Sequence, residues 1–395
     1  MDNQVRGIIT LIRSGLTGEK LALPEKFDLA AAFEVLKKHG IVALAYEGAV
    51  RCGLAANEPV MLKMLRLSGM NMLRSEAQMA AVERICAAFE ENGIDYMPLK
   101  GSRLKKLYPK PELRMMGDAD ILIRMEQYGA IRTVMEKLGF KEDMVTDHEL
   151  VWISDDLFLE LHKRLIPSYN KDFYGYFGDG WKLAKPVAGH RYGLGTEDEL
   201  IYLFTHFAKH YRDGGIGLRH VTDLWVYRQT YPGMDEGYVR RELEKLQLLE
   251  FYENVQRVLG CWFEDGAQDE KTGLITEFIF VSGSWGAWEN RVRSIEVKMA
   301  KETEGVESRR SDAIRMLLFP GVDWMSRRYP VLKKAPWLLP VFWVVRGITA
   351  VLFRRENVKY NRKLLDAKSV EEIENHRQAL QFVGLDFNFE AEEES

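Results

Sequence analysis

The hydrophobic period of the sequence changes twice along the chain, and these changes constrain the fold more than any other feature. Up to about residue 90, apolar side chains recur at the spacing of amphipathic helices. Residues 94–165 instead contain short apolar or alternating segments that are typical of strands, namely IDYMPLKGS, DADILIRM, ELVWISDD and LFLELHKRL. Helical spacing returns from Thr196. This order predicts an α+β protein in which a small mixed β-sheet core is embedded in mostly helical N- and C-terminal regions.

The same changes set the expected domain boundaries. We expect an N-terminal helical region over residues 1–90, a sheet-containing core over residues 91–190 and a C-terminal helical region over residues 191–395. A chain of 395 residues is long enough for two or three units of ordinary size.

Charge and cysteine content exclude some broad classes. Lys plus Arg number 55 and Asp plus Glu number 59, so the chain lacks the positive field of a dedicated nucleic-acid-binding protein. The three cysteines lie far apart and form no CxxC pair, which indicates buried apolar groups in a reducing compartment. The N-terminus has no long apolar run of the kind found in secretory signals. We therefore expect a cytoplasmic protein.

The most apolar stretch lies late in the chain, over residues 335–353. Pro336, Pro340 and Arg346 interrupt it, and its uncharged runs are shorter than the roughly 20 residues that span a bilayer. We expect no integral membrane association. The favoured interpretation is that this stretch packs against the rest of the helical region. The alternative is a weak peripheral membrane contact through residues 335–355, where lysines and arginines flank the apolar side chains.

Two aspartates carry the clearest chemical signal. Asp118 and Asp120 are two residues apart on a predicted strand, so their side chains share one face. Adjacent carboxylates repel each other, and a divalent cation with a preference for oxygen ligands, Mg²⁺ or Mn²⁺, relieves that repulsion. The alternation in LFLELHKRL places Glu160 and His162 on one strand face and leucines on the other. If the leucines pack on helices, Glu160 meets the two aspartates.

A short basic segment precedes these acids. Gly101 and Ser102 read as a turn whose backbone N–H groups can approach phosphates closely. Lys100 and Arg114 are expected to supply positive charge to the phosphate oxygens. Each element alone is common in proteins, and the hypothesis depends on their joint order along the chain.

At this point the sequence resembles a known family. LKGSRLKKLYPKPELRMMGDADILI and LELHKRL are similar to the uncharacterised bacterial nucleotidyltransferases of the DNA polymerase beta-like superfamily. Their pattern is a Gly-Gly or Gly-Ser turn, an Asp-x-Asp or Asp-x-Glu pair with apolar flanks, and a third acid on a later strand. The positions that match it are Gly101, Ser102, Asp118, Asp120 and Glu160.

The resemblance implies a function. It implies transfer of a nucleoside monophosphate from an NTP, with ATP binding among the expected properties, to an acceptor hydroxyl with release of pyrophosphate. Asp118, Asp120 and Glu160 would be the catalytic and metal-binding residues, and Glu160 would accept the proton of the acceptor. Lys100, Gly101, Ser102 and Arg114 would bind the nucleotide. The acceptor stays open and is a small molecule, a protein or an RNA.

Several further polar residues are candidates for lining the site. His206 and His210 are four residues apart on a predicted helix and therefore share a face. A zinc site is one interpretation, but the Glu of an H-E-x-x-H motif is missing and packing between helices is favoured. A third interpretation places them in the substrate cleft. The candidate cleft-lining residues are His162, His206, His210, Arg219 and Asp223.

Two other functions remain as alternatives. A metal-dependent glycosyltransferase also uses an Asp-x-Asp motif, but it would require a larger, mainly parallel nucleotide-binding domain before that motif. A catalytically silent nucleotide-binding or antitoxin-like module would keep the fold without turnover. The presence of all three acids favours an active enzyme.

Overall fold

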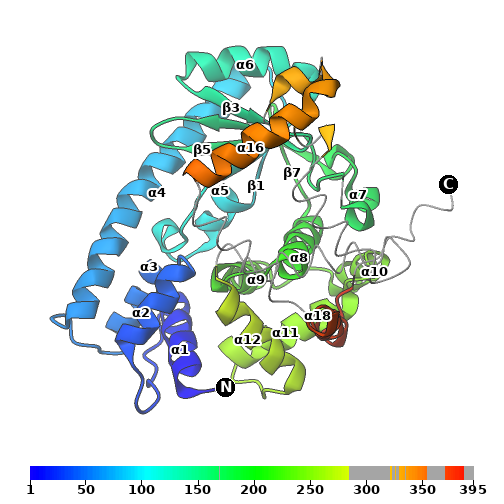
Figure 1. Cartoon of the computed structure of the whole chain (residues 1–395). Coiled ribbons are helices and arrows are strands. Elements are labelled where there is room, and N and C mark those ends of the chain that lie inside the picture. Colours follow the sequence, from blue (N-terminus) through cyan, green and yellow to red (C-terminus); the bar gives the residue numbers. More distant parts are fainter. Residues whose placement is uncertain are drawn as a thin grey trace. The chain divides into compact units, whose positions relative to one another are not determined.

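The computed structural model describes residues 1–168, 170–283, 321–322, 325, 329–333, 335–353 and 370–386 (Figure 1). The chain forms two compact units. The first comprises Met1–Ala287 and Val383–Ser395, and the second comprises Trp288–Phe382. The first unit carries the sheet and all the candidate site residues.

The first unit begins with helices. Their bounds are α1 (Asn3–Thr17), α2 (Leu29–Lys38), α3 (Val42–Arg51) and α4 (Pro59–Glu91). Asp2 and Asp28 cap α1 and α2 by accepting hydrogen bonds from backbone N–H groups of the first turn. Pro59 is the first residue of α4, where a backbone N–H would have no acceptor within the helix, so the missing N–H of proline costs nothing. Local sequence signals therefore account for these three helix starts.

A seven-stranded mixed sheet follows, and its strand order is β3-β4-β5-β2-β1-β7-β6. The strands are β1 (Tyr96–Leu99), β2 (Ala119–Ile123), β3 (Lys141–Val145), β4 (Glu149–Ile153), β5 (Phe158–His162), β6 (Lys185–Ala188) and β7 (Arg191–Gly193). The pairs β2–β5 and β1–β7 are parallel, and the other neighbours are antiparallel. The sheet and its helical flanks confirm the predicted α+β class.

Alternation along the central strands decides which side chains are available for chemistry. Ile121 of β2 and Leu159 and Leu161 of β5 are buried in a cluster with apolar side chains of α4 and of α6 (Tyr128–Lys137). Figure 1 shows both helices beside the sheet. Because successive strand residues point to opposite faces, Asp120 and Glu160 lie on the face that α4 and α6 do not cover.

Further helices complete the first unit. They are α5 (Lys100–Leu104), α7 (Lys171–Phe177), α8 (Thr196–Asp213), α9 (Leu218–Thr230), α10 (Glu236–Lys245), α11 (Leu249–Phe263) and α12 (Glu270–Ser282). An ion pair joins α5 to α8, since Arg103 donates two hydrogen bonds of 2.6 Å to the carboxylate of Glu199. Single-turn 3-10 segments lie at Lys105–Leu107, Pro111–Leu113, Met125–Gln127 and Trp181–Leu183.

The second unit contains α16 (Leu339–Phe353) and α18 (Val370–Phe382), with 3-10 turns at Pro330–Lys333 and Pro336–Leu338. Trp337 is 77% exposed. None of the helices in the described part of the chain is both long and apolar enough to cross a bilayer. The peripheral contact through residues 335–355 stays a prediction, and residues 354 and 355 lie outside the described residues.

The structure differs from the expected strand pattern in two respects. The four predicted strands are present, and the hairpin of β4 and β5 is among them. The strands β3, β6 and β7 were not predicted, and β3 and β6 are mostly exposed, so they lack an alternating apolar signal. The expected Lys-Gly-Ser turn is instead the beginning of α5, because the helix starts directly at Lys100.

Close packing of α1 against α3 provides a test of the helical region. A Cβ atom added to Gly48 would lie 1.8 Å from the carbonyl oxygen of Leu11, which is a backbone atom that cannot rotate away. We expect Gly48→Ala to lower the free energy of unfolding by at least about 2 kcal/mol through overpacking. Urea unfolding followed by circular dichroism measures this.

Gly69 is the matched control, because it lies within α4 and a Cβ there would meet nothing within 4 Å. Gly69→Ala should raise the free energy of unfolding by roughly 0.5–1 kcal/mol through helix propensity. Equal effects of the two substitutions would contradict the packing described for α1 and α3.

Candidate functional site

The pairing of β2 with β5 brings two of the predicted acids together. The strands are parallel, and Asp120 lies directly opposite Glu160 in their register. Asp118 precedes β2 and is two residues from Asp120, so the alternation of the chain directs it to the same face. Burial, together with the negative charges of Asp120 and Glu160, raises the pKa of the Asp118 carboxyl to about 6. The three carboxylates therefore form one electrostatically coupled group.

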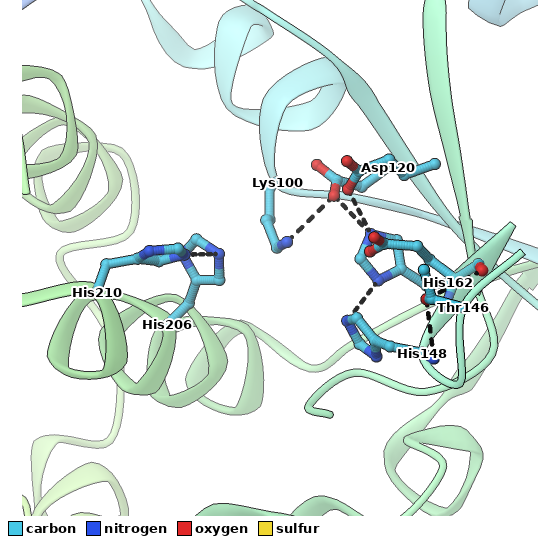
Figure 2. A network of polar contacts seen from close by, with 9 residues as sticks. Lys100, Asp120, Thr146, His148, His162, His206 and His210 are labelled. Atoms are coloured by element: carbon cyan, nitrogen blue, oxygen red, sulfur yellow. Dashed lines mark hydrogen bonds and ion pairs between the residues drawn. The ribbon is translucent and has the colours of Figure 1, made fainter. Parts of the chain in front are cut away.

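His162 lies between two of these acids. Its Nε2 atom is 2.7 Å from Oδ1 of Asp120 and 3.4 Å from Oε2 of Glu160 (Figure 2). Burial opposes the charged form of the imidazole, but the hydrogen bonds to both carboxylates hold its pKa above the usual range. One ligand atom each of Asp120, Glu160 and His162 lies within 4.8 Å of the others, so this group can hold a metal ion.

Lys100 places a positive charge beside these carboxylates. Its Nζ atom is 3.1 Å from Oδ1 of Asp120, and both side chains are largely buried. Burial alone would raise the pKa of Asp120, but Lys100 and His162 hold that pKa below its usual range. Lys100 has a φ of +33°, an uncommon value for a residue other than glycine, at the junction of β1 and α5. This conformation accompanies the contact with Asp120.

Gly101 and Ser102 are buried in the first turn of α5. A Cβ atom on Gly101 would lie 3.2 Å from Met116 and 3.4 Å from Nη1 of Arg114, so little room remains for a side chain. The Ser102 hydroxyl donates a hydrogen bond of 3.4 Å to the carbonyl of Leu99. The assignment of both residues to nucleotide binding stays a prediction.

Arg114 is held by a buried carboxylate on a different element. Its Nε and Nη2 atoms donate hydrogen bonds of 2.7 and 2.8 Å to the two carboxylate oxygens of Asp223 on α9. Tyr108 donates a further hydrogen bond of 2.7 Å to Oδ1 of Asp223. The structure therefore gives Arg114 and Asp223 a role in holding the segment before β2 against α9, and nucleotide binding by Arg114 stays a prediction.

The predicted histidines of α8 lie on the other side of Lys100 from the sheet (Figure 2). The Nε2 atoms of His206 and His210 are 3.0 Å apart. Burial and the nearby charge of Lys100 hold the pKa of His206 well below its usual range. Within the described ranges, the residue groups that can hold a metal are Asp120–Glu160–His162 and His148–Glu149–His162, and neither contains His206 or His210.

Arg219 on α9 is the remaining predicted residue. Its Nη1 atom donates a hydrogen bond of 3.0 Å to the carbonyl of Met115. Its positive charge acts on Asp118, whose pKa it lowers in part against the larger effect of burial. The positive charge of Lys100 also lowers the pKa of Asp118, so both basic side chains act on this carboxylate.

Two residues at this site, His148 and Tyr202, were not among the predicted site residues. Nε2 of His148 lies 3.1 Å from Nδ1 of His162, on the opposite side of the imidazole from the carboxylates. Tyr202 is buried, and its ring lies under the Lys100 ammonium at 5.9 Å. No local motif marks either residue, because the turn between β3 and β4 contributes His148 and α8 contributes Tyr202.

The fold and the site together define a mixed-sheet α+β protein with a group of carboxylates and basic side chains at two adjacent strands. A family model described as uncharacterised nucleotidyltransferase matches residues 25–264. The chain belongs to this nucleotidyltransferase family. A comparison with curated proteins and a comparison with solved structures found no match.

The raised pKa of Asp118 predicts a dependence of stability on pH. The folded-state pKa of about 6 lies above the reference value of 3.8, so ionisation of Asp118 opposes folding. The destabilisation is absent below pH 3.8 and complete above pH 6. We expect Asp118→Asn to raise the free energy of unfolding of the metal-free protein by about 3 kcal/mol at pH 8. Urea unfolding at pH 8 and pH 4 measures the difference.

Asp143, exposed on β3, serves as the control. Asp143→Asn should leave the difference between pH 8 and pH 4 unchanged. If Asp118→Asn raised the free energy of unfolding equally at pH 8 and pH 4, the result would contradict an electrostatic origin of the destabilisation.

The buried pair of Arg114 and Asp223 predicts a large loss of stability. Asp223→Ala leaves a buried guanidinium without its carboxylate, and we expect the free energy of unfolding to fall by about 3–5 kcal/mol. Thermal and urea unfolding measure this. Glu136→Ala removes an exposed partner of Arg132 and should change stability little. Equal effects would show that the Arg114–Asp223 pair does not hold this part of the fold.

Proposed function

We propose that the protein is a metal-dependent nucleotidyltransferase that moves a nucleoside monophosphate from an NTP to an acceptor hydroxyl. The observation that carries this proposal is the register of β2 and β5, in which Asp120 lies opposite Glu160, with Asp118 two residues before Asp120 in the chain. Membership of the nucleotidyltransferase family supports a transferase that uses a nucleotide.

The residues at this site fit a divalent cation. Asp120, Glu160 and His162 offer ligand atoms close to one another, and Asp118 adds a carboxylate whose ionisation its neighbours oppose. A bound Mg²⁺ or Mn²⁺ would neutralise these charges and polarise the phosphate oxygens of the substrate. Asp118, Asp120 and Glu160 are the proposed metal-binding and catalytic residues.

The basic side chains would bind the triphosphate of the substrate. The positive charges of Lys100 and Arg219 both act on Asp118, and these two side chains are the proposed partners of the phosphate oxygens. Gly101 and Ser102 lie directly after Lys100. His206 and His210 would lie on the α8 side of the bound substrate.

The reaction needs one proton acceptor. The acceptor hydroxyl attacks the α-phosphorus, the bond from this phosphorus to the bridging oxygen breaks, and pyrophosphate leaves. Glu160 is the proposed acceptor of the hydroxyl proton, because it is the more exposed of the two paired carboxylates, with 21% of its side chain accessible against 7% for Asp120. We assign this chemistry to the sheet-containing core of residues 91–190.

A labelling experiment tests the proposal. The purified chain is incubated with each α-³²P-labelled NTP, Mg²⁺ or Mn²⁺, and cell extract, and both the labelled product and released pyrophosphate are measured. We expect one NTP to label an acceptor. Asp120→Asn and Glu160→Gln should each lower the rate at least about 100-fold, because each removes a charge that organises the reacting groups.

Asp143→Asn is again the control, and we expect it to keep the full rate. Retention of transfer by Asp120→Asn and Glu160→Gln would contradict the assignment of the site. Nucleotide binding without any release of pyrophosphate would support the silent module instead. Transfer from nucleotide-sugars and not from NTPs would support the glycosyltransferase.

A further inference from the structure

The imidazole of His162 faces the same space as the two paired carboxylates. Nε2 is 2.7 Å from Asp120 and 3.4 Å from Glu160, although His162 belongs to the same strand as Glu160. The two residues are separated by one position, so the strand directs both side chains to one face. His162 is 1% exposed, which fixes its ring in a packed environment.

The other nitrogen of this ring is occupied by a second histidine. Nδ1 of His162 lies 3.1 Å from Nε2 of His148, and the two rings meet edge to face, with centroids 4.7 Å apart. In metal sites, a ligating histidine commonly uses one nitrogen for the metal and fixes its orientation through a hydrogen bond from the other. His162 has this arrangement, with Nε2 toward the carboxylates and Nδ1 toward His148 (Figure 2).

We propose that His162 is a direct metal ligand together with Asp120 and Glu160, and that this nitrogen makes the site select Mn²⁺ over Mg²⁺. Mg²⁺ prefers oxygen ligands, whereas an imidazole nitrogen suits first-row transition ions. Two carboxylates and one imidazole form a mixed set that Mn²⁺ accepts more readily. This proposal rests on the metal dependence proposed above, and it adds a ligand and an ion preference to it.

Binding of Mn²⁺ to the full chain tests the proposal without measuring activity. The free ion is followed by its electron paramagnetic resonance signal, and Mg²⁺ is added as a competitor. We expect Mn²⁺ to bind at least about tenfold more tightly than Mg²⁺. The electron spin echo of bound Mn²⁺ should show the modulation of a directly coordinated ¹⁴N nucleus.

Substitutions assign that nitrogen. His162→Gln should abolish the ¹⁴N modulation and lower the Mn²⁺ affinity at least about tenfold, so that the preference over Mg²⁺ shrinks. His148→Gln should keep the modulation and weaken binding about tenfold, because it removes only the orienting contact. His190→Gln is the matched control, since His190 pairs with Asp95 and lies outside the acid group, and it should behave as the wild-type chain.

Three outcomes would contradict the assignment of His162 as a metal ligand. Bound Mn²⁺ without ¹⁴N modulation in the wild-type chain would show that carboxylates hold the ion alone, and this result does not depend on any variant folding. Modulation that persists in His162→Gln, or an absence of Mn²⁺ binding, would also contradict it. Transfer from NTPs without ¹⁴N modulation would leave the proposed function intact, and modulation without transfer would support the ligand assignment while contradicting the proposed function.

Discussion

The parallel pairing of β2 with β5 is the constraint on which the site depends. These strands are neighbours in the sheet although Ile123 and Phe158 are separated by a helix and two further strands. Leu159 and Leu161 anchor β5 in the apolar cluster beneath α4 and α6, which leaves Glu160 and His162 on the opposite face. The hydrophobic core therefore fixes the positions of the polar groups.

The electrostatics of the site follow from this packing. Buried carboxylates that lie close together oppose one another's ionisation. Lys100 and His162 stabilise the charge of Asp120 and hold its pKa low. The pKa of Asp118, in contrast, stays raised. Such a group of partly compensated charges favours the binding of an additional cation. The pair of Arg114 and Asp223 differs, because each charge is fully engaged by its partner and by hydrogen bonds.

Local patterns in the sequence predicted much of this arrangement. Alternation identified the strands that carry Asp120 and Glu160, and the α+β class is confirmed. The contacts of Arg114 with Asp223 and of His162 with His148 were not predictable, because each joins residues on different elements and no spacing rule marks such a pair. The strand β6 was missed because its residues are all exposed and carry no alternation. Tertiary packing decides these features.

Anomalous diffraction from crystals of the full chain soaked in Mn²⁺ would locate the bound ion and so test whether the paired acids hold it. We expect a manganese peak on the face of the β2–β5 pair that α4 and α6 do not cover, within ligand distance of Asp120 and Glu160. A peak at another place in the chain with none at this pair, or side chains of Asp120 and Glu160 turned away from each other, would contradict it.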